Sequence, residues 1–160
     1  MANRDTSSPS RAAVQRGALV VGVVFILVGV LVFIPGVTTD YSSMTFASHH
    51  SGALLLGIFQ VSVLHNAVHL LFGLAGIVLA RTAVRARNYL LYGGLIYGAL
   101  FLYGALFLYG LVVPSLSAAN FVPVNDADNF LHLVLAVGVI ALAFLLDRGR
   151  AESKIGTAAA

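Results

Sequence analysis

Two histidines and an asparagine interrupt an otherwise apolar segment of the chain. The segment is VSVLHNAVHLLFG, residues 61–73, and its polar members include His65, Asn66 and His69. Positions four apart share one face of a helix, so His65 and His69 could present two neutral imidazoles to one metal ion. The zinc-protease motif H-E-x-x-H is not met, because Asn66 stands where that motif needs glutamate. The spacing therefore permits a metal pair without specifying one.

A second element of the same kind lies closer to the C-terminus. Aligning residues 66–80 with residues 129–143 places Asn66 on Asn129 and His69 on His132, with apolar residues following in both. The shared pattern is N-x-x-H-L. It predicts a tandem repeat of two helical hairpins that brings the histidines to one depth near the outer surface.

Three interpretations of this predicted histidine cluster stay open. The asparagines and histidines could hydrogen-bond between helices and tie the hairpins together, which is the interpretation that the sequence favours. His65, His69 and His132 could instead hold a divalent metal, or His69 and His132 could ligate a haem iron. The same residues could also form a site for a lipid, a quinone or another small molecule.

The composition places these residues in a membrane protein. Of 160 residues, 59% are hydrophobic and 9% are charged, whereas soluble domains carry about 25% charged residues. Four apolar segments are candidates to cross a bilayer: about residues 17–35, 60–80, 89–113 and 130–146. We predict an all-α fold with one transmembrane domain, residues 17–147, between cytoplasmic tails 1–16 and 148–160. Residues 52–59 are expected to form a short outer interfacial helix.

The basic residues predict the orientation of the four spans. All nine lie before the first span, between the second and third, or after the fourth. They are Arg4, Arg11, Arg16, Arg81, Arg85, Arg87, Arg148, Arg150 and Lys154. The other two links, residues 36–51 and 114–129, contain none. Because basic loops stay in the cytoplasm, we predict a multi-pass protein of the inner (cytoplasmic) membrane with both termini cytoplasmic. Separate clusters of this kind suit anionic lipid rather than nucleic acid.

The third predicted span carries a stripe of small residues. Gly94 and Gly98 form a small-x-x-x-small pair, Ala105 falls close to the same stripe, and Gly93 and Gly104 lie on an adjoining one. Such faces allow close approach of another helix. The face could pack within the chain or form a homodimer seam. In the repeated YGALFL sequence, Tyr97, Tyr103 and Tyr109 point to three different sides of the helix and form no ladder. A redox or ligand wire of tyrosines is the remaining alternative for this span.

The predicted spans contain no Lys, Arg, Asp or Glu, although pumps usually keep such a residue inside the membrane. No catalytic triad order or phosphate-binding loop is present. We therefore expect a non-enzymatic membrane protein, an accessory or structural subunit that packs with itself or with a membrane partner and needs no cofactor. The alternatives are a haem- or metal-binding protein and a lipid- or quinone-binding protein.

The elements FQVSVLHNAVHLLFGLAG, residues 59–76, and NDADNFLHLVLAVG, residues 125–138, resemble a bacterial family of small four-helix membrane proteins. That family is catalogued as a domain of unknown function. The resemblance covers about residues 14–147, and H-N-x-x-H-L followed by N-x-x-H-L is its most specific part. It implies a topology without an activity.

Overall fold

The computed structural model describes residues 9–108 and 121–146, and four helices make up most of this part. They are α1 (Pro9–Val32), α2 (Val63–Leu79), α3 (Ala83–Leu108) and α4 (Asp126–Leu145). A small cap at one end of the bundle, named the outer cap for the side on which the sequence predicts it, joins α1 to α2. It contains the strands β1 (Thr38–Thr39), β2 (Leu54–Leu55) and β3 (Phe59–Gln60), and a short 3-10 helix, Tyr41–Ser43.

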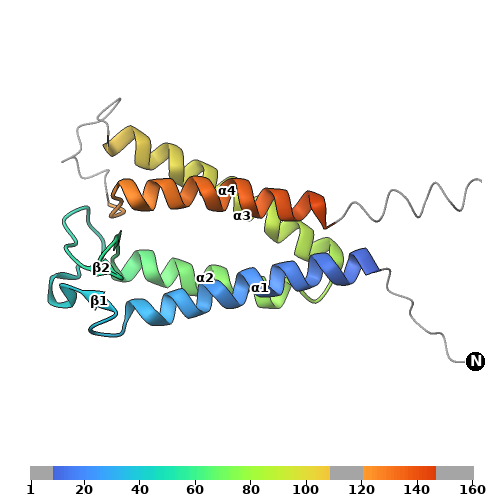
Figure 1. Ribbon diagram of the computed structural model, residues 1–160, viewed down its shortest axis with the longest axis horizontal. Helices are drawn as coiled ribbons and strands as arrows, with labels where there is room; N and C mark the ends of the chain where they lie inside the picture. Colours follow the sequence, from blue (N-terminus) through green and yellow to red (C-terminus); the bar gives the residue numbers. More distant parts are fainter. Residues whose placement is uncertain (1–8, 109–120, 147–160) are drawn as a thin grey trace, which may run out of the picture.

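The helices form two antiparallel hairpins that lie side by side. α1 packs along α2, and α3 packs along α4 (Figure 1). The main helix contact between the hairpins is made by α1 and α3. α2 and α4 are therefore not a closely packed helix pair.

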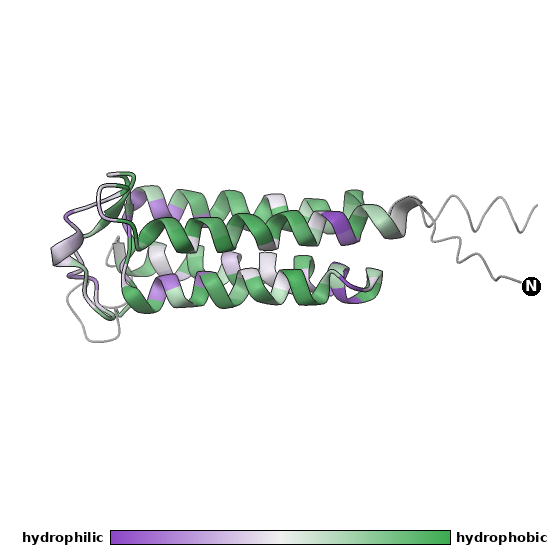
Figure 2. Ribbon diagram, turned by 90° about the horizontal axis from the view of Figure 1, so that it is seen from below, coloured by the Kyte–Doolittle hydropathy of each residue, from purple (hydrophilic) through white to green (hydrophobic). Residues whose placement is uncertain are grey.

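Three of the helices are long and apolar enough to cross a membrane, which makes this a membrane protein. The qualifying stretches are Ala12–Val32, Ala83–Phe107 and Asp126–Leu145. α2 is apolar but shorter, with 17 residues, which span about 25 Å at 1.5 Å per residue. Figure 2 shows hydrophobic residues along the helices and hydrophilic residues toward the two ends of the bundle.

Two helices extend beyond the membrane spans that the sequence predicts. α1 begins at Pro9 rather than near residue 17, because Val14 and Ala18 are buried against Ala86 and Leu90 of α3. α4 begins at Asp126 rather than at residue 130, because Asn125 caps its N-terminus. Its cap is a reciprocal capping box, which satisfies backbone N–H groups that a helix leaves unpaired.

Parts of several predictions lie outside the described residues. These are residues 109–113 of the third predicted span with Tyr109, the tail residues 1–8, and the C-terminal tail with its three basic residues.

The outer cap corrects one expectation about the fold. Residues 52–59 were expected to be helical, but β2 and β3 form an antiparallel hairpin, and β2 also pairs with β1. Leu56, Gly57 and Ile58 connect the two strands, and Leu56 and Gly57 have positive φ angles of 56° and 71°, which residues other than glycine rarely adopt. Pairing with β1 gives the backbone of this apolar segment hydrogen-bond partners that an isolated short helix would lack.

Candidate functional site

Three histidine rings lie together where the outer ends of α2 and α4 face each other. The ring centroids of His65 and His69 are 4.5 Å apart, as expected from neighbouring turns of α2. The centroids of His65 and His132 are 6.1 Å apart, across the two hairpins. His132 is only 3% exposed. The structure therefore gathers the three histidines that the sequence singles out as candidate ligands.

Two aromatic rings lie beneath the histidines. Phe25 of α1 and Tyr97 of α3 stack with centroids 5.4 Å apart. His69 lies 5.5 Å from the ring of Phe25, and His132 lies 5.7 Å from the ring of Tyr97. Each histidine thus contacts the aromatic residue of its own hairpin, and the two aromatics meet at the centre of the bundle.

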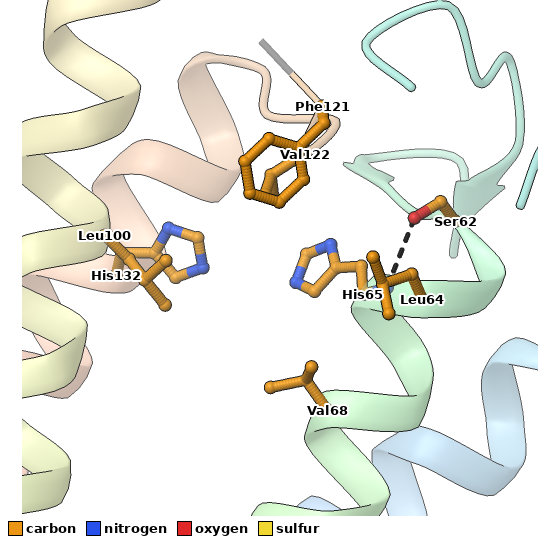
Figure 3. Close-up of a pocket in the computed structure, with 8 residues that line it drawn as sticks. All are labelled: Ser62, Leu64, His65, Val68, Leu100, Phe121, Val122 and His132. Atoms are coloured by element: carbon orange, nitrogen blue, oxygen red, sulfur yellow. Dashed lines mark hydrogen bonds between the residues drawn. The ribbon is translucent and has the colours of Figure 1, made fainter. Parts of the chain in front are cut away.

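The imidazoles of His65 and His132 both line a cavity of about 150 Å³. In Figure 3 the two rings face each other across this opening. The wall is otherwise almost entirely apolar. It is formed by Ser62, Leu64 and Val68 near the start of α2, by Leu100 of α3, and by Phe121 and Val122 ahead of α4.

A second cavity of about 130 Å³ lies between the outer cap and the helices and shares His65 and His132 with the first. His69 and Asp128 also line it, together with apolar residues of α1, α4 and the cap. The Oδ2 atom of Asp128 accepts hydrogen bonds from the backbone N–H groups of Gln60, at 2.8 Å, and Asn125, at 3.1 Å. The carboxylate thereby fixes the cap to the start of α4.

The histidine Nδ1 atoms have no hydrogen-bond partner, although all three are buried. Leaving a buried polar atom unpaired costs about 1–3 kcal/mol. A neutral imidazole offers one donor and one acceptor nitrogen. The walls of both cavities are almost entirely apolar, and the Nδ1 atoms are buried behind them. The cavities therefore suit an apolar group, and an imidazole ring would have to turn to hydrogen-bond to a molecule inside them.

The two asparagines turn toward their own hairpins rather than toward each other. Asn66 is fully buried, and its side-chain amide donates to the carbonyl oxygen of Gly29 in α1 at 2.8 Å. The side chain of Asn129 is buried against Gly104 in α3. Each asparagine thus joins the two helices of one hairpin, while the histidines occupy the space between hairpins.

The small-residue face of α3 has three glycines in close internal contact. A Cβ atom at Gly94 would lie 3.0 Å from the carbonyl oxygen of Ala136 and even closer to the side chain of Ile140 in α4. A Cβ at Gly93 would meet the ring of Phe72 at 2.5 Å. Gly104 faces Asn129, as noted above. At Gly98 the nearest atom would be the Cβ of Ala136 at 3.9 Å, and Ala105 is half-buried.

α1 and α2 approach each other through a similar contact. A Cβ atom at Gly22 would lie 2.8 Å from the carbonyl oxygen of Gly73 and 2.9 Å from the backbone nitrogen of Ile77. Only glycine allows backbones this close. In the alignment that equates His69 with His132, Gly73 and Ile77 match the residues that Gly94 faces, Ala136 and Ile140.

The arrangement of the candidate histidines does not add support for a metal site. Within residues 9–108 and 121–146, no group of three or more His, Asp or Glu side chains is arranged to hold a metal ion.

Sequence patterns do not single out Phe25, Gly29 or Gln60. A signal for Phe25 exists, because extending the predicted repeat to the first helix of each hairpin matches GVVF, residues 22–25, to GLIY, residues 94–97. Gly29 and Gln60 contribute backbone groups at the site, and backbone groups carry no residue-type signal.

The family comparison covers nearly all of this structure. Residues 15–145 match the family model of a domain of unknown function, DUF4383. The chain belongs to this family. The DUF4383 region includes most of α1, all of the outer cap and the three histidines, so the candidate site lies inside it. No curated protein and no solved structure matches the chain.

Proposed function

We propose that the chain crosses the inner membrane of a bacterium four times, with both termini in the cytoplasm. The described basic and acidic residues support this, because they lie at opposite ends of the bundle. The basic end carries Arg16, Arg81, Arg85 and Arg87, and the capped end carries Asp40, Asp126 and Asp128. α2 would be the fourth span, with the outer cap completing the thickness that its 17 residues leave uncovered.

Within that membrane, we propose a non-enzymatic protein that binds a small amphipathic molecule of the lipid or quinone class between its hairpins. One observation carries the proposal: His65 and His132 both line one apolar cavity, and each has a buried Nδ1 atom without a partner. A ligand with hydrogen-bonding oxygens on an apolar body would satisfy both features.

The size of the cavity favours a ring-sized group. An apolar cavity of about 150 Å³ can hold one benzene-sized ring. The cavity lined by His65, His132 and Phe121 has this volume. Phe121 forms part of its wall and offers a face for stacking. The head group of a quinone suits this cavity with one carbonyl oxygen toward the imidazole pair, because the two histidine rings, with centroids 6.1 Å apart, are too close together to sit at opposite carbonyls.

Binding of a short-chain quinone to the detergent-purified protein tests the proposal. With ¹⁵N-labelled histidine, we expect the signals of His65 and His132 to shift on titration, while those of His49 and His50 stay in place. His65→Phe and His132→Phe keep a ring but remove the polar atoms, and each should weaken binding about tenfold, as lost hydrogen bonds to a buried site do. His50→Phe, in the exposed cap, is the matched control.

Two results would overturn this proposal. One is quinone affinity that is equal in the wild type and in both cavity variants. The other is a haem absorption band, or stoichiometric zinc or copper in the purified protein that is lost in the His65→Phe variant. The second result would favour the haem- or metal-binding alternative.

The tandem repeat is also part of this proposal. Three pairs of corresponding contacts support it: Gly22 with α2 and Gly94 with α4, His69 on Phe25 and His132 on Tyr97, and the inward-turned asparagines. Phe25 and Tyr97 correspond in the two hairpins and stack on each other. A pseudo-twofold axis passing between them would explain why equivalent histidines reach one site.

An accessory-subunit role is the second candidate, and one observation in the cap favours it. Leu56 adopts the left-handed conformation that a leucine rarely takes, and its side chain is 60% exposed. Residues with strained backbone conformations cluster at functional sites. Phe46 and Ile58 are also exposed in the cap, so this apolar tip could dock on a second copy or a membrane partner.

Particle mass tests that second role. For a self-associating protein extracted with its surrounding lipid, the protein part of the particle mass should exceed the 16.8 kDa of one chain, and Leu56→Asn should return it to one chain. Asparagine tolerates the left-handed conformation, so the cap should stay folded. A single-chain particle for the wild type, with no other protein in stoichiometric amount, would argue against the role.

A further inference from the structure

A second hollow lies at the opposite, basic end of the molecule, away from the histidines. It is a groove of about 290 Å³ between α2 and α3. These two helices pack less extensively than α1 with α2 or α3 with α4, which leaves the groove open along their length. Its lining comprises Phe72, Ala75 and Leu79 of α2 and Arg85, Asn88, Tyr89, Tyr92, Gly93 and Ile96 of α3.

The polarity of the groove changes along its length. Arg85 and Asn88 line it in the first two turns of α3, and both are exposed. Farther along, Phe72, Ala75 and Ile96 provide apolar walls. From Arg85 to Ile96 the helix rises about 16 Å, close to the roughly 15 Å depth of one leaflet of the hydrocarbon core. The groove therefore has the polarity and the length of a single lipid chain with its head group.

The positive charge at the basic end of the bundle favours an anionic head group. Arg81, Arg85 and Arg87 lie together around the start of α3, and the described acidic residues lie at the other end of the bundle. Arg87 belongs to another face, since its guanidinium lies 5.6 Å from the ring centroid of Phe144 in α4. Arg85 is the arginine that lines the groove, and a guanidinium matches phosphate oxygens with two parallel hydrogen bonds.

We propose that this groove binds one anionic phospholipid, with its phosphate on Arg85 and Asn88 and an acyl chain along Phe72, Ala75 and Ile96. The proposal needs only that the chain lies in a membrane. It is independent of a ligand at the histidines, so either site can fail without the other.

Native mass spectrometry of the detergent-purified full chain tests the proposal. The probes are phosphatidylglycerol and phosphatidylcholine with identical acyl chains. We expect one phosphatidylglycerol per chain to be retained under conditions that remove phosphatidylcholine. Arg85→Gln should lower its affinity roughly fivefold, the effect of one basic residue near an anionic lipid. Arg81→Gln removes the same charge from the same end but outside the groove, and should change the affinity little.

The chain-binding part of the groove needs its own variant. Ile96 is 53% exposed, so Ile96→Trp should fill the groove without disturbing the core, and should reduce lipid retention with Arg85 intact. An unchanged melting temperature in lipid-free detergent shows that the variant is folded.

Three results would overturn the proposal. Equal losses in Arg81→Gln and Arg85→Gln would indicate diffuse attraction to the basic end. Full retention in Ile96→Trp would place the acyl chain elsewhere. A dimer that excludes the lipid would show that a second copy covers the groove.

Discussion

At the C-terminal end of α1, single side chains complete the hydrogen bonding of a helix. The last four carbonyl groups of a helix have no partner within it. Here Gly29 accepts from the Asn66 amide, and Val32 accepts from the Thr38 hydroxyl, both at 2.8 Å. The carbonyls of Val30 and Leu31 accept from the next turn of backbone. All four are therefore satisfied, as an apolar environment requires.

Removing either side-chain partner should destabilise the protein. Asn66→Leu and Thr38→Val keep roughly the same volume but leave one carbonyl unpaired, so each should lower the free energy of unfolding by about 1–3 kcal/mol. Denaturant titration in detergent, followed by circular dichroism, measures this. Leu71→Ala, at a side chain that is 66% exposed, is the control and should have a smaller effect. Wild-type stability in both polar variants would mean that water replaces the lost groups.

At the scale of elements, glycines set how closely the helices of a hairpin approach. Gly22 brings α1 against the backbone of α2, and Gly94 brings α3 against α4. Without glycine at these points the helices would have to separate, and the histidines that they carry would separate with them.

The two glycines of the α3 stripe should therefore respond differently to the same change. In Gly94→Ala the added methyl would overlap Ile140 and approach the Ala136 carbonyl, so we expect a cost of about 1–3 kcal/mol from overpacking. In Gly98→Ala the methyl has room, at 3.9 Å from the nearest atom, and the better helix propensity of alanine should stabilise the protein by up to about 1 kcal/mol. Unfolding in detergent measures both. A Gly98→Ala variant as unstable as Gly94→Ala would show that α3 packs differently.

At the scale of the whole molecule, charge separates the two ends and should decide how the chain is threaded. The described arginines near the α2–α3 link lie at one end of the bundle, and Asp40 of the cap lies at the other end with Asp126 and Asp128 at the start of α4. Basic segments resist transfer across the membrane, so the link should stay in the cytoplasm and the cap should face outward.

Reporter fusions test the threading. A reporter fused after residue 150 should behave as cytoplasmic, and one inserted at Ser43 in the cap should behave as external. Replacing Arg81, Arg85 and Arg87 together with glutamine weakens the signal that holds the link in the cytoplasm. In this variant we expect a smaller fraction of the chains to have the cytoplasmic link and the external cap. An external C-terminus in the unmodified chain would contradict the four-span arrangement.

The sequence by itself determines the class of protein and the helices, because hydropathy acts locally. Long apolar stretches predict α1, α3 and α4 wherever they pack, since a backbone in lipid must satisfy its own hydrogen bonds. The spacing of His65 and His69 likewise predicts a shared face from helix geometry alone. Membership of the family of unknown function follows from the same residues.

Only the tertiary structure decides what these elements meet. The apolar residues 52–59 could be helix or strand by composition, and pairing with Thr38–Thr39 makes them strands. Asn66 could bond to any nearby acceptor, and the close approach of α1 presents the carbonyl of Gly29. The cavity between His65 and His132 exists because α1 and α3 make the main contact between hairpins, which leaves the outer ends of α2 and α4 apart. Such distances depend on the packing of all four helices together, and no local pattern encodes them.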